Sequence, residues 1–463
     1  MGKNRARDKI SKTERTQTMK TIQRLILFLF AALLCLFPLA SCKKDDTPTI
    51  RYLNFKPEIA QKYKELADLY YKETGVRVII DTAASGTYEQ TLAAKMSTSE
   101  RPTLFQVNGP RGYANWKDYC ADLSQTKIYD ALSDKDLALK GDGGKIVGIP
   151  YVVEGYGIIY NKALTDKYFA LGNRQKTVNS MDEIRGFDAL KTVVEDMQAH
   201  KNELGIDGVF ATTSLKTGED WRWTTHLFNI PLTYEFEERE LDLGDDNALS
   251  EIYFSSEREM RNIFDLYIRN SVSAPTMLGT KTVADSMSEF ALEKCVMVQN
   301  GNWAWAQIAS LDGNRVKAEN VAFLPIYTGA QGEAERGLAI GTENYMCINE
   351  KASAEEKKLA EDFLAWVYSS DTGKRYVTEE FGFIAPFNTF NENELPKDPL
   401  AREVLRYASM ENVRSIPWNF TLFPSQAFKD ALGSSLLRYA QGAKDWSGVV
   451  SDTVSKWKSE MGT

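Results

Sequence analysis

The sequence predicts an α/β protein of two lobes, each with a β-sheet flanked by helices. Residues 42–463 exceed what one hydrophobic core usually serves, so two lobes are the natural expectation. Near their start, two strand-like runs, Arg51–Phe55 and Val76–Ile80, flank one helix-like run, which is the pattern of a βαβ unit with a parallel sheet. Further along, Lys145–Leu164 and Val321–Tyr327 are extended runs that suit a chain passing from one lobe to the other.

Each element is predicted from its own local signal. Pro57 suits the first helical position and Gly75 suits the end of the helix, with apolar residues at helical spacing between them. Ser353 and Glu356 form a capping box, which predicts that another helix begins there. The remaining predictions are a strand at 103–107, helices at 86–96, 187–200, 257–270 and 283–292, and two amphipathic helices at the C-terminal end.

The two candidate crossings divide the chain between the lobes. We expect the N-terminal lobe to comprise residues 50–152 and 322–380. We expect the C-terminal lobe to comprise residues 153–321 and 381–463. Lys145–Leu164 supports the first division because glycines and a proline lie at its centre, between two β-rich runs.

The N-terminus predicts secretion and a lipid anchor. Leu25–Phe37 is an unbroken apolar run preceded by basic residues, which is typical of a signal peptide and too short to span a bilayer. The following "LASC" resembles the lipobox of bacterial lipoproteins, which implies removal of residues 1–41, acylation of Cys42 and a tether over residues 42–49. Met19 is an alternative start, since the basic region before Lys20 is unusually long. We therefore expect an extracytoplasmic protein, lipid-anchored to a bacterial membrane.

Charge and cysteine content narrow the class of partner. Residues 1–41 carry a net charge of +6; because the whole chain carries −8, residues 42–463 carry −14. Such an acidic chain argues against nucleic acid or an anionic membrane surface as a partner. Cys120, Cys295 and Cys347 lie apart in apolar surroundings, which indicates buried thiols and not disulfides or a metal site.

Three stretches resemble one known family across essentially the whole mature chain. They are "IPYVVEGYGIIYNKAL", "MVQNGNWAWAQI" and the run from Gly337 to Val377. They are similar to the sugar-binding members of the extracellular solute-binding proteins of ABC importers, of which the maltose-binding protein is the best-known relative. The resemblance implies a periplasmic-binding-protein fold, with a carbohydrate, expected to be an oligosaccharide, held between two lobes that close around it.

The first candidate binding residues lie on two of these stretches. Glu154 lies in the first crossing, where the family has an acid that contacts the ligand; the alternative is a solvated residue. Trp303 follows the turn at Asn302, where the family carries a stacking tryptophan, and Asn302 could offer its amide to the same ligand. We expect Trp303 and Trp305 to point in different directions, one toward the ligand and one into the core; the alternative is that both are core.

Further candidates follow from the same resemblance. Asn108 and Arg111 follow the third strand, where the maltose-binding protein has an Asp–Arg pair, so the missing acid implies different hydroxyl geometry. Lys56 is a weaker candidate, and Glu58 is explained equally well as a first-turn residue of its helix. Trp221 and Trp418 correspond to aromatic ligand contacts in relatives, with core packing as the alternative.

The sequence offers little for catalysis. Its two histidines lie away from any nucleophile motif, and no phosphate-binding or metalloprotease motif is complete. We therefore expect a binding protein that is not an enzyme, needs no cofactor or metal, acts as a monomer and delivers its ligand to the permease subunits. The alternatives are a surface-anchored carbohydrate-active enzyme and a binding protein for a non-sugar solute such as iron, a polyamine or a peptide.

Overall fold

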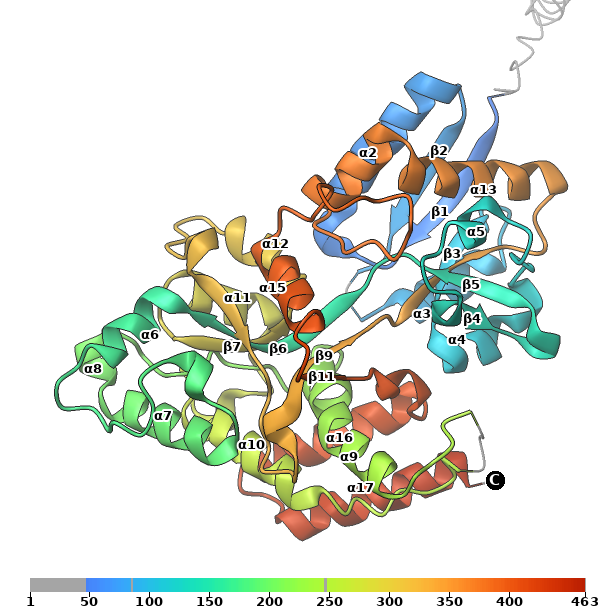
Figure 1. The fold of residues 1–463 in the computed structure, drawn as a ribbon. Helices are drawn as coiled ribbons and strands as arrows, with labels where there is room; N and C mark the ends of the chain where they lie inside the picture. The colour runs from blue at the N-terminus through green and yellow to red at the C-terminus, as the bar shows by residue number, and fades with distance from the viewer. Residues whose placement is uncertain (1–46, 85, 245–247, 463) are drawn as a thin grey trace, which may run out of the picture. The chain divides into compact units, whose positions relative to one another are not determined.

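The computed structural model describes residues 47–84, 86–244 and 248–462, and the chain from Pro48 onward forms one compact unit. The predicted signal peptide, Cys42 and most of the tether lie outside the described residues. Within them, two β-sheets with many helices confirm the α/β prediction (Figure 1).

The first sheet contains the predicted βαβ unit. Its six strands lie in the order β2 (Arg77–Thr82), β1 (Thr49–Asn54), β3 (Leu104–Asn108), β10 (Asn344–Ile348), β5 (Ile146–Pro150) and β4 (Leu139–Lys140). β1 pairs in parallel with β2 and β3, as a βαβ connection requires, whereas β10 pairs antiparallel to β3 and β5. β10 therefore completes the centre of this sheet, although it comes almost 200 residues after β5 in the chain.

Helices accompany the first sheet as their apolar spacing predicts. α2 (Ala60–Thr74) buries Tyr63, Leu66 and Tyr70, and it ends at Gly75, whose φ of 74° is left-handed. α13 (Ala354–Ser369) begins with the predicted capping box between Ser353 and Glu356, and it packs near β1 (Figure 1). The other helices that accompany the first sheet are α3 (Tyr88–Met96), α4 (Gly109–Trp116), α5 (Lys127–Asp130) and α14 (Asp371–Arg375).

The second sheet is built around one fully buried strand, β6 (Glu154–Asn161). β7 (Met297–Gly301), β8 (Val321–Leu324) and β9 (Arg336–Gly341) all pair antiparallel to it, and β11 (Arg414–Ile416) extends the sheet beyond β9. Its helices are α6 (Lys162–Phe169), α7 (Phe187–Ala199), α8 (Lys201–Leu204), α9 (Phe228–Glu238), α10 (Glu257–Arg269), α11 (Val283–Ala291), α12 (Ala304–Ala309), α15 (Pro399–Ala408), α16 (Gln426–Ala440) and α17 (Trp446–Met461).

The strand pairings show where the chain passes between the two sheets. The chain leaves the first sheet after Pro150 and enters the second at Glu154. It returns between Gly341 and Asn344, not at residue 322, because β8 and β9 both pair with β6. Val321–Tyr327 resembles a crossing because it is extended and apolar, but its first four residues form a buried strand of the second sheet.

The last crossing also lies later than the predicted boundary at residue 381. Phe381, Phe383 and Phe387 belong to the hydrophobic core of the first sheet, and Val153 forms a β-bridge with Ile384. The chain reaches the second sheet only at α15, which packs against β8 and β9. These three phenylalanines thus hold this stretch against the first sheet, because they pack into its hydrophobic core.

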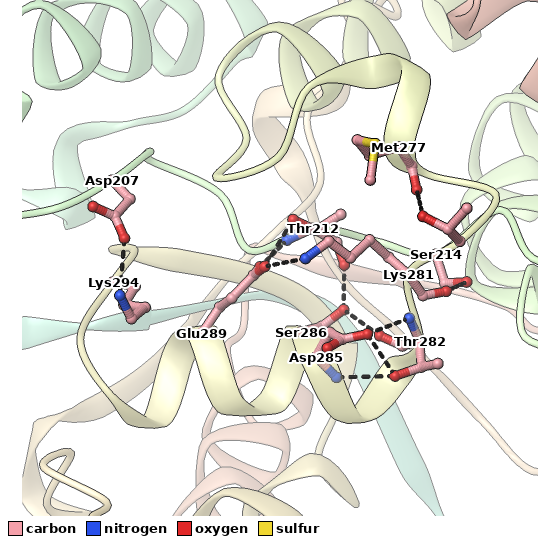
Figure 2. Close-up of polar contacts among 11 residues, drawn as sticks. Asp207, Thr212, Ser214, Met277, Lys281, Thr282, Asp285, Ser286, Glu289 and Lys294 are labelled. Carbon is pink, nitrogen blue, oxygen red and sulfur yellow. Dashed lines mark hydrogen bonds and ion pairs between the residues drawn. The ribbon is translucent and has the colours of Figure 1, made fainter.

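A polar network fixes the segment that leads to the candidate site. The Glu289 carboxylate of α11 accepts hydrogen bonds from the backbone N–H of Thr212 (2.6 Å) and from its hydroxyl (3.1 Å), and Ser286 donates to the Thr212 carbonyl (Figure 2). Next to it, the Thr213 carbonyl accepts from the buried indole N–H of Trp223 at 3.3 Å. The buried polar groups named here therefore have hydrogen-bond partners, and these bonds anchor the helix that follows.

That following helix begins with a π-helical segment, Arg222–Leu227, which runs directly into α9. Pro231 lies inside α9, so it cannot donate the usual hydrogen bond to the carbonyl of Leu227. The wider π-helical turn precedes this break in the hydrogen-bond ladder. Short π-helical segments within α-helices frequently mark functional sites.

Candidate functional site

A buried ion pair links the end of β1 to the start of β6. Lys56 Nζ lies 2.7 Å from Glu154 Oε1 and 3.7 Å from Glu58 Oε1. Burial acts to lower the pKa of the Lys56 ammonium, but the Glu154 and Glu58 carboxylates outweigh it and raise this pKa above its usual range. Lys56 is thus held in its charged form, although it is only 5% exposed.

Six aromatic side chains form a second group, the aromatic cluster, beside this ion pair. Its members are Tyr156, Trp221, His226, Trp303, Trp418 and Phe420. The Trp303 ring centroid lies 6.0 Å from that of Trp221 and 6.3 Å from that of Trp418. Lys56 Nζ lies 5.7 Å from the Trp303 ring centroid, so the charged pair and the cluster form one site.

Two glycines make room for the tryptophans. A Cβ atom on Gly301 would lie 2.1 Å from the Trp303 ring, and one on Gly341 would lie 2.7 Å from Trp418. No other residue fits at either position without displacing an indole. The sequence around the aromatic cluster is therefore arranged to let Trp303 and Trp418 approach the backbone.

The π-helix contributes two polar side chains to the same region. The Arg222 guanidinium carbon lies 4.0 Å from the ring centroid of Trp221, and the His226 ring centroid lies 4.9 Å from it. Burial lowers the pKa of Arg222 to about 10, and burial together with the positive charges of Arg222, Lys429 and Lys56 lowers that of His226 well below its usual value. At neutral pH Arg222 is therefore charged and His226 is neutral.

A second carboxylate, Glu343, lies on the return crossing between the sheets. Asn108 Nδ2 donates to Glu343 Oε2 at 3.3 Å. Burial and the Glu154 carboxylate raise the pKa of Glu343 to about 7, against the lowering effect of Lys56 and Lys429. Glu154 and Glu343 thus stand on two of the crossings, and both act electrostatically on Lys56.

Five of the eight predicted residues lie in this site. They are Lys56, Glu154, Trp221, Trp303 and Trp418. A sixth, Asn108, is linked to them only through its hydrogen bond to Glu343. Asn302 is buried and adjacent, but its side-chain oxygen already accepts a hydrogen bond from the backbone N–H of Gly155 at 2.9 Å. Arg111 instead contacts the Leu422 carbonyl and the Met461 sulfur.

The two neighbouring tryptophans separate as predicted. Trp303 directly precedes α12 and joins the aromatic cluster, whereas Trp305 packs half-buried against the hydrophobic core around α11 and α12. In the other tryptophan pair, Trp221 is half-buried in the site, and Trp223 is core. The direction in which each indole points is a structural result, and its role toward a ligand remains a prediction.

Sequence reasoning missed Arg222, His226, Glu343 and Lys429. Arg222 and His226 are four residues apart in "RWTTH", which placed both on one side of a turn beside Trp221 and was the available signal. Glu343 and Lys429 carry no local signal, because sheet pairing and helix packing bring them to the site from distant segments.

The site combines flat aromatic faces with charged groups and hydrogen-bonding groups. Such a combination suits a ligand with C–H surfaces and many hydroxyls. Among the described residues no group of three His, Cys, Asp or Glu could hold a metal ion, and Cys120, Cys295 and Cys347 are free and buried. In the same part of the chain, no helix is long and apolar enough to cross a membrane.

Comparisons with known proteins agree with this architecture. Three solved structures share the fold. A solute-binding protein, RafE, in complex with raffinose aligns with a TM-score of 0.67 at 17% identity, over 90% of this chain and 100% of its own. A chitin oligosaccharide binding protein gives 0.66 at 17% identity, over 90% and 100%. Maltose-bound MalE3 of T. maritima gives 0.62 at 17%, over 89% and 99%.

A family model extends this result to the sequence itself. The model described as bacterial extracellular solute-binding protein matches residues 59–403, which include β6, the π-helix and Trp303. This match covers well over half of the chain. The chain belongs to the bacterial extracellular solute-binding proteins.

Proposed function

We propose that this protein is the substrate-binding component of an ABC importer and that its ligand is a carbohydrate, most simply an oligosaccharide. The observation that carries the proposal is the aromatic cluster beside the Lys56–Glu154 ion pair. Indole faces stack on the C–H surfaces of sugar rings, and charged groups with fixed geometry bind hydroxyls. The proteins of similar fold that bind raffinose, chitin oligosaccharides and maltose support this class of ligand.

The mechanism that we propose is closure of one sheet toward the other around the ligand. Glu154 and Glu343 lie on chain crossings, Lys56 follows a strand of the first sheet, and the tryptophans come from segments of the second. A ligand that contacts both groups stabilises the closed form relative to an open one. The closed form is then the state that the permease subunits recognise.

The anchor forms a separate part of the proposal. Cys42 is acylated after removal of residues 1–41, and this lipid holds the protein at the extracytoplasmic face of a bacterial membrane. The full chain, expressed in a bacterial host with labelled palmitate, is expected to carry label and to sediment with membranes. Cys42→Ser is expected to lose both. A Cys42→Ser protein that keeps its label and its membrane association would contradict the anchor without affecting the ligand proposal.

Binding is tested by thermal unfolding of residues 42–463 with a panel of oligosaccharides. A ligand that binds only the folded state raises the melting temperature. Trp303→Ala is expected to abolish the increase, whereas Trp305→Ala, a matched change two residues away, is expected to keep it. A panel in which only peptides, polyamines or metal ions raise the melting temperature would overturn the carbohydrate assignment. Analysis of the recovered sugar for cleavage tests the enzyme alternative.

A further inference from the structure

The Arg222 guanidinium is buried in the site without an acid to balance its charge. The residue is 2% exposed, and its Nε and Nη1 atoms have no hydrogen-bond partner. Within the described residues, no carboxylate oxygen lies within 4.0 Å of it. Its contact is the Trp221 ring, which holds the guanidinium in place but cannot accept two directed hydrogen bonds.

Other buried arginines in the same chain are satisfied. Arg174 is also buried, and its three nitrogens donate to the carbonyls of Phe169, Gln175 and Val178 and to the side chain of Asn179. Arg336 forms an ion pair with Glu237. A buried charge without partners is costly, so structural arginines acquire them during folding. Arg222 departs from this pattern at the one place where a ligand is expected.

Two groups near Arg222 also have hydrogen-bonding capacity that the protein does not use. The Thr225 hydroxyl donates its only hydrogen to the Trp221 carbonyl, so His226 Nδ1 must be the donor in its 2.9 Å contact with Thr225 Oγ1. Because His226 is neutral, its Nε2 is then an acceptor, and it has no partner. The Trp418 indole N–H, 7% exposed and in the same aromatic cluster, is an unused donor.

We infer that the ligand is an acidic carbohydrate and that Arg222 binds its anionic group, a uronic acid carboxylate or a sulfate. This inference rests on the proposed function and names the chemical class of ligand. A guanidinium offers two parallel N–H donors that match a carboxylate or sulfate, whereas a hydroxyl would leave the buried charge unbalanced. Lys56 does not fill this role, since Glu154 and Glu58 already balance its charge.

The remaining groups suit the rest of such a ligand. His226 Nε2 accepts from one sugar hydroxyl, the Trp418 N–H donates to another, and the half-buried Trp221 and Trp303 offer faces to the ring. Glu219 and, more weakly, Glu58 act on Arg222 electrostatically, but neither forms an ion pair with it; Glu219 pairs with Lys216 and Glu58 with Lys56. A ligand anion would therefore supply the partner that neither glutamate supplies.

The test uses matched ligand pairs on residues 42–463 and needs no mutation for its first step. Uronic acid oligosaccharides are compared with their carboxyl-reduced counterparts, and sulfated oligosaccharides with their desulfated counterparts, by isothermal titration calorimetry. Each pair keeps its linkage and stereochemistry. We expect one acidic ligand to bind about 10- to 100-fold more tightly than its neutral counterpart, the range for hydrogen bonds to a charged group. The pair that responds identifies carboxylate or sulfate as the recognised group.

Arg222→Gln is then expected to remove this preference, lowering affinity for the acidic ligand about 10- to 100-fold while changing that for the neutral one less than threefold. Arg239→Gln is the matched control: Arg239 also stacks on an aromatic ring, 4.1 Å from the Tyr253 centroid, but pairs with Glu235. Neutral oligosaccharides that bind as well as their acidic counterparts would overturn the inference and leave the proposed function intact. An acidic preference that survives Arg222→Gln would overturn the assignment to Arg222. If no carbohydrate binds, the proposed function itself fails.

Discussion

The Lys56 ammonium lies 2.7 Å from the Glu154 carboxylate, although 98 positions separate the two residues in the sequence. Lys56 lies two residues after the end of β1, and Glu154 is the first residue of β6, so this ion pair ties the two sheets together. Both residues are buried, which makes the pair expensive to break from one side.

We expect Lys56→Met to reduce the free energy of unfolding by about 3–5 kcal/mol, because it leaves the buried Glu154 and the half-buried Glu58 without their cation. The double variant Lys56→Met/Glu154→Leu is expected to lose clearly less than the sum of the two single changes. Urea unfolding of all four proteins without ligand measures this coupling. Additivity to within about 0.5 kcal/mol would mean that the pair contributes nothing beyond its separate side chains.

Glu343 predicts a pH dependence of stability. Burial first, and the Glu154 carboxylate second, raise its pKa from 4.5 to about 7 in the folded protein. Between these values the folded state binds a proton that the unfolded state does not. The contribution of Glu343 to stability is therefore fully present below pH 4.5 and is lost as the pH rises through 7.

Glu343→Gln removes this titration, so its free energy of unfolding is expected to fall less than that of the wild type between pH 5 and pH 8. Chemical unfolding at four pH values across this range provides the measurement, and the exposed Glu392→Gln variant serves as control. If the Glu343→Gln and wild-type curves run parallel, the Glu343 carboxyl is not protonated in the folded state at pH 5.

The sequence predicted the fold through local signals that folding preserved. The βαβ unit at 51–80 and the capping box at Ser353 both depend on neighbouring residues, and both are confirmed. The return crossing was misplaced, because β8 and a crossing strand are both short, apolar and extended. Only the pairing of β8 with β6 distinguishes them, and pairing is a long-range property.

The dependence on long-range contacts also explains which residues of the candidate site the sequence could predict. Trp221, Trp303 and Trp418 stand out in the sequence because tryptophan is rare, and the structure brings all three together. Arg222 looks like an ordinary polar helix residue, and its significance depends on burial without a partner. Arg111 was a reasonable prediction from its place after β3, but contacts with Leu422 and Met461 direct it elsewhere.

Gly301 provides a test of how tightly Trp303 is positioned. A methyl group at Gly301 would lie 2.1 Å from the Trp303 ring, so Gly301→Ala is expected to displace this indole from Trp221 and His226. We expect a loss of about 1–3 kcal/mol in stability, the usual cost of overpacking, and a change in tryptophan fluorescence. Gly172→Ala is the control, because nothing lies within 4 Å of its Cβ position. Unchanged fluorescence in Gly301→Ala would mean that the Trp303 ring does not lie over this glycine.

Substitution of Ser353 is expected to change the stability of the protein without changing its affinity for the ligand. Its hydroxyl accepts a hydrogen bond from the backbone N–H of Glu356, and the Glu356 carboxylate accepts one from the backbone N–H of Ser353. Ser353→Ala is expected to cost about 1 kcal/mol through loss of this cap of α13, and Ser353→Asp is expected to retain most of the stability, since aspartate caps helices equally well. Thermal unfolding provides the measurement. Because α13 packs near β1 and β10 and contributes no side chain to the aromatic cluster, ligand affinity in both variants is expected to match the wild type. A large loss of affinity in Ser353→Ala would show that α13 is coupled to the site.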